Sequence, residues 1–226
     1  MIQIESPMLL LDASTPILHT GAIDGDRWLA LERQRGDVVT LLPTMARRVV
    51  AESGLDFPAF RSLVHCEGPG SLLGLRLCAM MIETWRVMPG MENVRLFAYR
   101  SLAVEAAIIS GARSGGFSVV TQYGKGNYCV GDSDGADRGT CEEAGLASLG
   151  GEVFAIVQRN QKELPSYVKG VEYDLTALPG IIAKEHGLFR PTDRAEAYSP
   201  RLSEYKHWDG RRHASHEKPI DTPRND

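Results

Sequence analysis

Two short segments of this sequence carry the polar residues and glycines that can bind an anion. The first is an apolar run from Leu9 that ends in the carboxylate of Asp12 and the hydroxyls of Ser14 and Thr15. Such a run predicts a short buried strand. The carboxylate where it ends can help to place a metal ion or a water molecule, or it can simply bond the amides of its own turn. We favour the structural role, because the chain lacks a convincing second phosphate loop.

The second segment connects an apolar strand pattern at 62–67 to an apolar helix pattern at 72–88. Its glycines permit positive φ and close backbone approach, and Ser71 can cap the helix and leave its first N–H groups free. Such a corner can hold an anion or another backbone, and Arg76 can contact a phosphate or a partner carboxylate, or be solvated. The spacing fits neither the dinucleotide fingerprint nor a P-loop. The phosphate-loop-like residues are Asp12, Ser14, Thr15, Gly68, Gly70, Ser71, Gly74 and Arg76.

Residue patterns for catalysis are mostly missing from the sequence. The close histidine pair, His213 and His216, falls in a polar terminal stretch, and no His-Glu-x-x-His pattern occurs. His65 and Cys66 are neighbours on a predicted strand and therefore face opposite sides. The turn at 132–135 imitates a second phosphate loop but has no helix start after it. We therefore expect no catalytic residues, no metal and no cofactor, and no ATP hydrolysis by this chain alone.

The elements that must position these segments follow from apolar periodicity and turn signals. The first half predicts strands at 8–12, 17–24, 27–34, 62–67 and 94–98, and helices at 38–53, 72–88 and 101–110. The second half predicts a linker at 111–116, strands at 117–122, 126–131 and 153–157, a helix at 175–186 and a polar tail. This order indicates α/β layers. We divide the chain into an N-terminal lobe (1–110), a C-terminal lobe (117–202) and a frayed tail (203–226).

Composition limits the class of protein. Of the 226 residues, 43% are hydrophobic and 24% are charged, which is typical of a globular chain. The net charge of −4 argues against a broad basic surface for nucleic acid. The four cysteines form no Cys-x-x-Cys pair, which indicates a reducing cytoplasm. No apolar run approaches the ~18 residues that cross a bilayer, so we expect no membrane association.

The two segments together resemble one family, the bacterial TsaB (YeaZ) proteins of the actin-like ATPase superfold. Members open with a strand ending Asp-Thr-Ser-Thr, here Asp12-Ala13-Ser14-Thr15, and carry a Gly-Pro-Gly-Ser-Phe-Thr-Gly-Leu-Arg loop, here with Leu72-Leu73 in place of Phe-Thr. The resemblance extends from about residue 8 to about residue 110. Beyond it, Thr121-Gln122-Tyr123 replaces the family's Asp-Ala-Arg, and Tyr198 to Arg201 keeps a family-like Tyr-x-x-Arg.

The resemblance implies a two-lobed actin-like ATPase (ribonuclease H-like) fold, with mixed sheets flanked by helices and a reduced second lobe. It further implies a non-catalytic scaffold for a TsaD-type partner in tRNA N6-threonylcarbamoyladenosine modification, with a TsaE-like ATPase in the assembly and tRNA contacted only indirectly. The alternative is a divergent actin-like ATPase or phosphotransferase that uses Asp12 and the Gly68–Gly74 loop.

The helix at 72–88 is apolar nearly all round, which fits either a core helix or one covered by another protein. In the family, the first two helices pair with those of TsaD or of a second copy, so the resemblance implies a heterodimer, with a homodimer possible. The partner-binding residues expected on this basis are Leu41, Met45, Val49, Leu73, Leu77, Met80, Met81 and Trp85.

Overall fold

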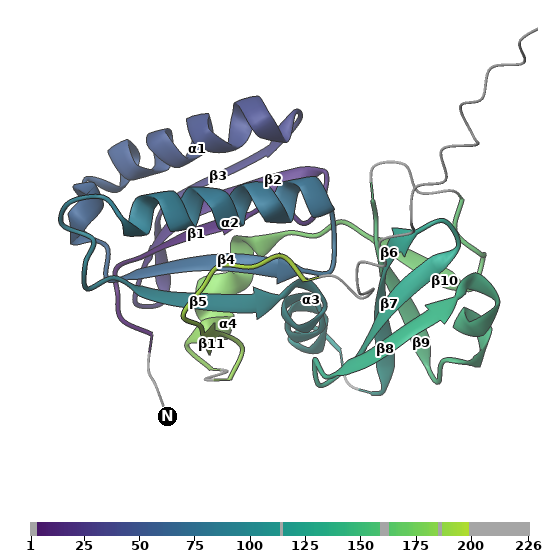
Figure 1. Ribbon diagram of the computed structural model, residues 1–226. Helices are drawn as coiled ribbons and strands as arrows, with labels where there is room; N and C mark the ends of the chain where they lie inside the picture. Colours follow the sequence, from purple (N-terminus) through teal and green to yellow (C-terminus); the bar gives the residue numbers. More distant parts are fainter. Residues whose placement is uncertain (1–3, 114, 159–162, 185–186, 199–226) are drawn as a thin grey trace, which may run out of the picture.

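The computed structural model describes residues 4–113, 115–158, 163–184 and 187–198, which form two mixed β-sheets flanked by helices (Figure 1). The first sheet has the order β11-β5-β4-β1-β2-β3. Its strands are β1 (Met8–Asp12), β2 (Ile17–Asp24), β3 (Arg27–Arg35), β4 (Ser62–Gly68), β5 (Arg95–Arg100) and β11 (Arg190–Pro191). β1 to β3 form an antiparallel meander, and β4 and β5 add parallel to β1. The predicted α/β class with two mixed sheets is confirmed.

Helices cover both faces of the first sheet (Figure 1). They are α1 (Val38–Ser53) and α2 (Leu72–Arg86) on one face, and α3 (Ser101–Ser110) and α4 (Leu178–Ile182) on the other. The alternation along β1 explains this arrangement, because successive side chains of a strand point to opposite faces. Leu9 and Leu11 are buried in one cluster with residues of α1 and α2, whereas Leu10 is buried in another with residues of α3.

The ends of α1 follow the capping signals in the sequence. The Asp37 carboxylate accepts the Thr40 N–H at 2.9 Å, and Gly54 closes the helix in the left-handed region with φ 71°. α1 and α2 begin at the same end of the sheet and run side by side (Figure 1). Two parallel helices therefore present their N-termini together, close to the predicted anion-binding corner.

The second sheet has the order β10-β9-β6-β7-β8. Its strands are β6 (Phe117–Gly124), β7 (Asn127–Asp132), β8 (Asp137–Glu142), β9 (Glu152–Ile156) and β10 (Val168–Val171). One face packs on α3, and the short 3-10 helix η2 (Glu143–Ser148) supplies Leu146 to the core of the other. Two more 3-10 helices, η1 (Phe57–Ala59) and η3 (Leu175–Ala177), complete the elements.

The second half departs from the sequence prediction in two places. β8 lies in an interval for which no strand is predicted, because five of its six residues are exposed and give no apolar alternation. The predicted helix at 175–186 is instead η3 followed by the five-residue α4, with residues 185 and 186 outside the described ranges. Pro179 and Gly180 stand within α4, and both are poor residues for extending a helix.

The chain returns to the first sheet after β10. The Trp28 Nε1–H donates to the Thr176 carbonyl at 2.9 Å, β11 pairs with β5, and the Tyr198 N–H donates to the Glu67 carbonyl at 2.6 Å. Thr176, Arg190 and Tyr198 fall in the predicted C-terminal lobe (117–202), whereas these contacts are with the first sheet. The predicted tail at 203–226 lies outside the described residues.

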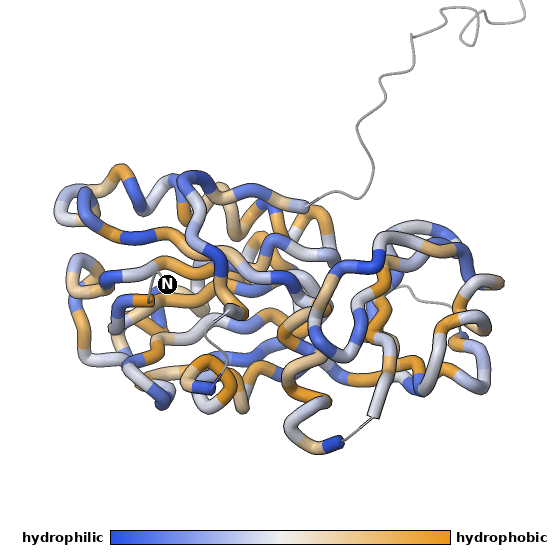
Figure 2. Tube along the Cα trace, turned by 90° about the horizontal axis from the view of Figure 1, so that it is seen from below, coloured by the Kyte–Doolittle hydropathy of each residue, from blue (hydrophilic) through white to orange (hydrophobic). Residues whose placement is uncertain are grey.

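Hydrophobic residues recur along the chain in both lobes and alternate with hydrophilic stretches (Figure 2). This is the pattern expected of elements that bury one face and expose the other. Among the residues that the structure describes, no helix combines the length and the apolar character needed to cross a membrane.

Candidate functional site

The two segments singled out in the sequence lie against each other. The Ser71 N–H, at the start of α2, donates to the Ser14 carbonyl at 2.7 Å. A Cβ on Gly70 would lie 2.2 Å from that same oxygen, and a Cβ on Gly74 would lie 2.0 Å from the Ala13 oxygen. Both glycines are therefore required by close backbone approach. The sequence predicts that this corner can hold an anion or another backbone. In the structure, the backbone of Ala13 and Ser14 contacts it.

The remaining residues of the corner make local bonds. The Ser71 Oγ accepts the Gly74 N–H at 3.4 Å and caps α2, and the Thr15 hydroxyl donates to the Ile17 carbonyl at 2.8 Å. Gly68 adopts φ 113°, which favours glycine. Arg76 is exposed, and no ion pair involves it within the described ranges. The predicted corner is therefore assembled in space, with Arg76 on its outer side.

Asp12 is completely buried where β1 ends. Its Oδ1 accepts the Ser14 N–H at 2.7 Å, and its Oδ2 accepts the hydroxyls of Tyr99 at 2.6 Å and Tyr173 at 3.0 Å. Hydrogen bonds to a charged acceptor are among the stronger ones in proteins. Three donors from β5, the returning segment and its own turn thus satisfy this carboxylate, which supports the structural role favoured from the sequence.

The two tyrosines were not among the residues that sequence reasoning selected. They lie 87 and 161 residues from Asp12, and only the strand order and the return of the chain bring them to it. Burial, followed by the charge of Asp12, raises the pKa of Tyr99 and Tyr173 well above the ordinary value for tyrosine. Both hydroxyls therefore stay protonated and remain donors to the carboxylate over the physiological pH range.

Further titratable groups are buried around this point. The rings of His19 and Tyr173 pack edge to face, with their centroids 5.9 Å apart. Burial lowers the pKa of the His19 imidazole, although the charge of Asp12 acts to raise it. Burial, with a smaller contribution from Asp174, raises the pKa of Glu105 to about 7. Across the described part of the chain, no three His, Cys, Asp or Glu side chains are grouped so that they could hold a metal ion.

A cavity of about 690 Å³ lies between the end of β5, α3, the turn after β7 and the segment at 187–190, and Tyr99 is among the residues that line it. The turn supplies Asp134 and Gly135, part of the sequence that imitates a phosphate loop. In that turn, the Asp132 carboxylate accepts the Asp134 and Ala136 N–H groups and pairs with Arg138. These bonds close the hairpin between β7 and β8. They give Asp132 a structural role in the turn that involves no ligand.

The predicted partner-binding residues divide into three sets, which are exposed, partly buried and fully buried. Leu73 and Met80 on α2 are 60% and 67% exposed, and Val87, just after the helix, is 83% exposed. These three residues recur every seven positions and so line one side of α2. Leu41, Leu77, Met81 and Trp85 are partly buried.

Met45 and Val49 correct the prediction. Both are fully buried in the cluster between α1 and the sheet, so they are core residues and present nothing to a partner. The side of α1 that carries Met45 and Val49 packs on the sheet, so these two side chains are unavailable for a second protein.

The arrangement of strands and helices in this chain matches that of solved structures. A Pseudomonas aeruginosa protein described as similar to peptidase YEAZ superposes with a TM-score of 0.64 and 16% identity over 87% of this chain and 100% of its own. A structure described as YeaZ from the same organism gives 0.64 and 15% over 86% of this chain and 100% of its own. The chain has the YeaZ fold. The resemblance expected from the sequence is thereby confirmed at the level of fold.

A more remote structural match is a Bacteroides thetaiotaomicron protein described as having an actin-like ATPase fold and unknown function, with a TM-score of 0.38 and 11% identity over 80% of this chain and 98% of its own. No protein-family model matches the sequence, and no curated protein matches it. The YeaZ fold here therefore stands on structure, with sequence identity of 15–16%.

Proposed function

We propose that this chain is a TsaB-type, non-catalytic subunit that supports a TsaD-type partner in tRNA N6-threonylcarbamoyladenosine modification. The YeaZ fold, shared over most of this chain and the full length of both Pseudomonas proteins, supports the proposal. In this proposal the protein works in the cytoplasm, a TsaE-like ATPase joins the assembly, and tRNA is contacted through the partners.

The state of Asp12 is the observation that carries the non-catalytic part of the proposal. An actin-like enzyme needs the carboxylate at the end of its first strand to reach a metal ion or a water molecule. Here three donors hold that carboxylate, and it has no exposed surface. The glycine corner that would cradle a phosphate is packed on the backbone of residues 13 and 14. The site geometry thus favours a structural use of both segments.

The exposed apolar side of α2 supports the scaffold part. Large exposed hydrophobic side chains are ordinarily scattered singly, and a row of them marks a contact surface for another protein. Leu73, Met80 and Val87 form such a row on a helix whose opposite side is buried on the sheet. We propose that α2, with the neighbouring surface of α1, receives the helices of the partner.

A divergent ATPase or phosphotransferase is the second candidate, and one observation favours it: the turn that follows Asp12 packs against the glycine corner. This function requires Asp12 to exchange its tyrosine donors for a ligand. Calorimetric titration with millimolar ATP and magnesium tests it directly. Binding that Asp12→Asn abolishes would establish this candidate in place of the scaffold.

The scaffold proposal is tested by affinity capture of the tagged full chain with the TsaD-type protein of its source cells, followed by reconstitution of tRNA threonylcarbamoylation. We expect Met80→Asp to abolish capture and the modification that depends on it, because a carboxylate would be desolvated at the contact. Val157→Asp is the matched control, since Val157 is an apolar side chain of the second lobe with 43% exposure. Equal capture by wild type and Met80→Asp would contradict the proposal.

A further inference from the structure

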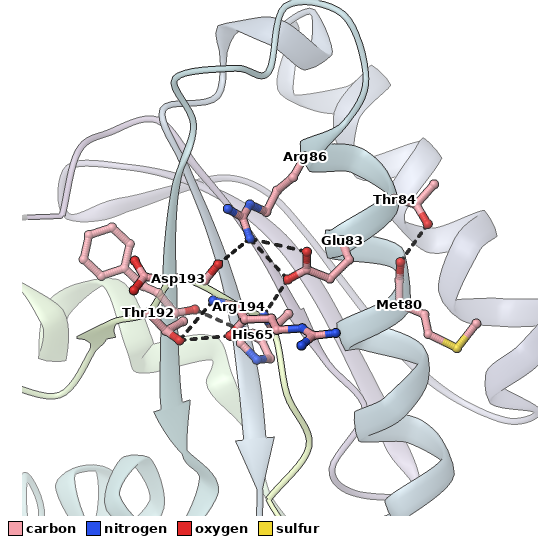
Figure 3. A network of polar contacts seen from close by, with 10 residues as sticks. His65, Met80, Glu83, Thr84, Arg86, Thr192, Asp193 and Arg194 are labelled. Carbon is pink, nitrogen blue, oxygen red and sulfur yellow. Dashed lines mark hydrogen bonds and ion pairs between the residues drawn. The ribbon is translucent and has the colours of Figure 1, made fainter.

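The layer that contains α1 and α2 has a third element, the segment at 192–198, which we call the strap. The Ala195 N–H donates to Glu83 Oε1 of α2 at 2.6 Å, and Arg86 Nη1 of α2 donates to the Asp193 carbonyl at 2.7 Å. Figure 3 shows Glu83 and Arg86 directed toward the strap. Ala195 is buried in the same cluster as the core residues of α1 and α2. The strap therefore flanks α2 on the side away from α1.

The pairing of Arg48 fixes which side of α1 faces α2. Arg48 forms an ion pair with Glu32 on β3, so this flank of α1 lies over the edge of the sheet. The opposite flank carries Val39, Pro43 and Arg47, all exposed, and it faces α2. The exposed surface of the layer thus runs from this flank of α1, across the apolar row of α2, to the strap.

This surface carries cations that are not paired within the chain. Arg47 on α1, Arg76 on α2 and Arg194 on the strap are exposed, and none of them forms an ion pair in the part of the chain that the structure describes. Glu83 is already bonded to Arg86 and to the strap. Asp193 and Glu196 are the exposed acids of the strap. Three arginines against two carboxylates leave an excess of one positive charge on a chain whose net charge is −4.

The start of α2 adds to this excess. The Asp37 carboxylate caps α1, whereas α2 is capped by the uncharged Ser71 and has no acidic residue in its first turn. A helix N-terminus carries a partial positive charge of about half a unit. Arg76 lies just beyond the first turn of α2, where its own charge opposes that end of the dipole. A negatively charged group from outside the chain would relieve both.

We infer that the partner of this layer presents an apolar helix surface edged with carboxylates that face Arg47, Arg76 and Arg194. The inference rests on the proposed function and specifies the chemistry of its partner. A second copy of this chain is a poor occupant, because a symmetric interface would set one positively charged patch against an identical one. Complementary charge at the edge of an apolar contact also accelerates association and excludes other partners.

Binding of the TsaD-type protein to the full chain, measured by biolayer interferometry at 50 and 500 mM salt, tests the inference. We expect Arg76→Glu/Arg194→Glu to weaken binding at least ~10-fold at low salt and to remove most of its salt dependence. Lys125→Glu is the control, because Lys125 is exposed on the turn between β6 and β7. Thermal unfolding of each variant establishes that it is folded.

Other outcomes separate this inference from the proposed function. Binding that Met80→Asp abolishes and the double arginine variant leaves unchanged would overturn the inference and preserve the scaffold proposal. No binding by the wild type would overturn both. A wild-type homodimer in sedimentation at micromolar concentration, disrupted by Met80→Asp, would overturn the acidic partner in favour of a second copy. ATP binding lost in the arginine variant would assign Arg76 to a nucleotide instead.

Discussion

Removing one hydroxyl from the Asp12 site gives a sharp test of the structural role of that carboxylate. Tyr99→Phe deletes the 2.6 Å bond to Oδ2 and keeps the ring, which packs against Phe189 at 5.2 Å. A hydrogen bond to a charged group contributes about 1.5–3 kcal/mol. Because Tyr173 still donates to the same oxygen, we expect a loss of about 2 kcal/mol in the free energy of unfolding, or ~4–8 °C in Tm for a chain of this size.

The double variant Tyr99→Phe/Tyr173→Phe extends the test. Each single variant leaves one donor on Oδ2, whereas the double variant leaves that buried oxygen with none. An unsatisfied buried acceptor has its own desolvation cost, so we expect the double loss to exceed the sum of the single losses by about 1 kcal/mol or more.

Urea denaturation followed by circular dichroism measures all three variants, with Tyr167→Phe as the control at a ring that is 49% exposed. A loss below about 0.5 kcal/mol for Tyr99→Phe, or a strictly additive double variant, would refute the reasoning. The carboxylate would then have another source of stabilisation than its two tyrosines.

Two further predictions concern the buried loops and histidines. Gly74→Ala should destabilise the protein by at least ~2 kcal/mol in urea denaturation, because its Cβ would overlap a backbone oxygen. Gly180→Ala, with open space around it, is the control and should not destabilise it. Equal free energies of unfolding for the two variants would show that the corner can move. Burial lowers the pKa of His19 and His65 below 6.5, so the unfolded state takes up protons that the folded state does not, and the free energy of unfolding should fall as pH drops from 7 to 5. Glu105, with a pKa of about 7, acts in the opposite direction over this range, so the fall should be steeper in Glu105→Gln; an equal or shallower slope would contradict the assignment.

The first lobe follows closely from local patterns. The apolar periodicity predicts α1 with its observed bounds, and β1 and β2 agree in the same way. Elements whose burial depends on distant parts of the chain were harder to predict. β8 is a polar edge strand held by its pairing with β7, and the two-residue β11 exists only through its pairing with β5. Local periodicity carries no information about such pairings.

The candidate site shows the same division. The sequence locates the two loops and the caps, because strand ends, glycines and Ser71 are local signals. It does not reveal that Tyr99 and Tyr173 enclose the carboxylate, since that depends on strand order and on the returning segment. The assignment of Met45 and Val49 to a partner surface failed for a related reason: an apolar stripe does not state whether a sheet or another protein covers it.

The return of the chain after β10 also sets the order in which the protein can be completed during synthesis. The first lobe is begun by β1 but is closed by residues from the last quarter of the described chain, among them Tyr173 and Ala195. While a ribosome is still translating the second sheet, Asp12 lacks the hydroxyl of Tyr173, one of its three donors. The apolar cluster between α1, α2 and the first sheet still lacks Ala195. The nascent first lobe, whose third helix ends at Ser110, therefore stays partly open until Tyr173 and Ala195 have been translated, and a chain that stops before residue 173 releases a lobe with an unfinished interior.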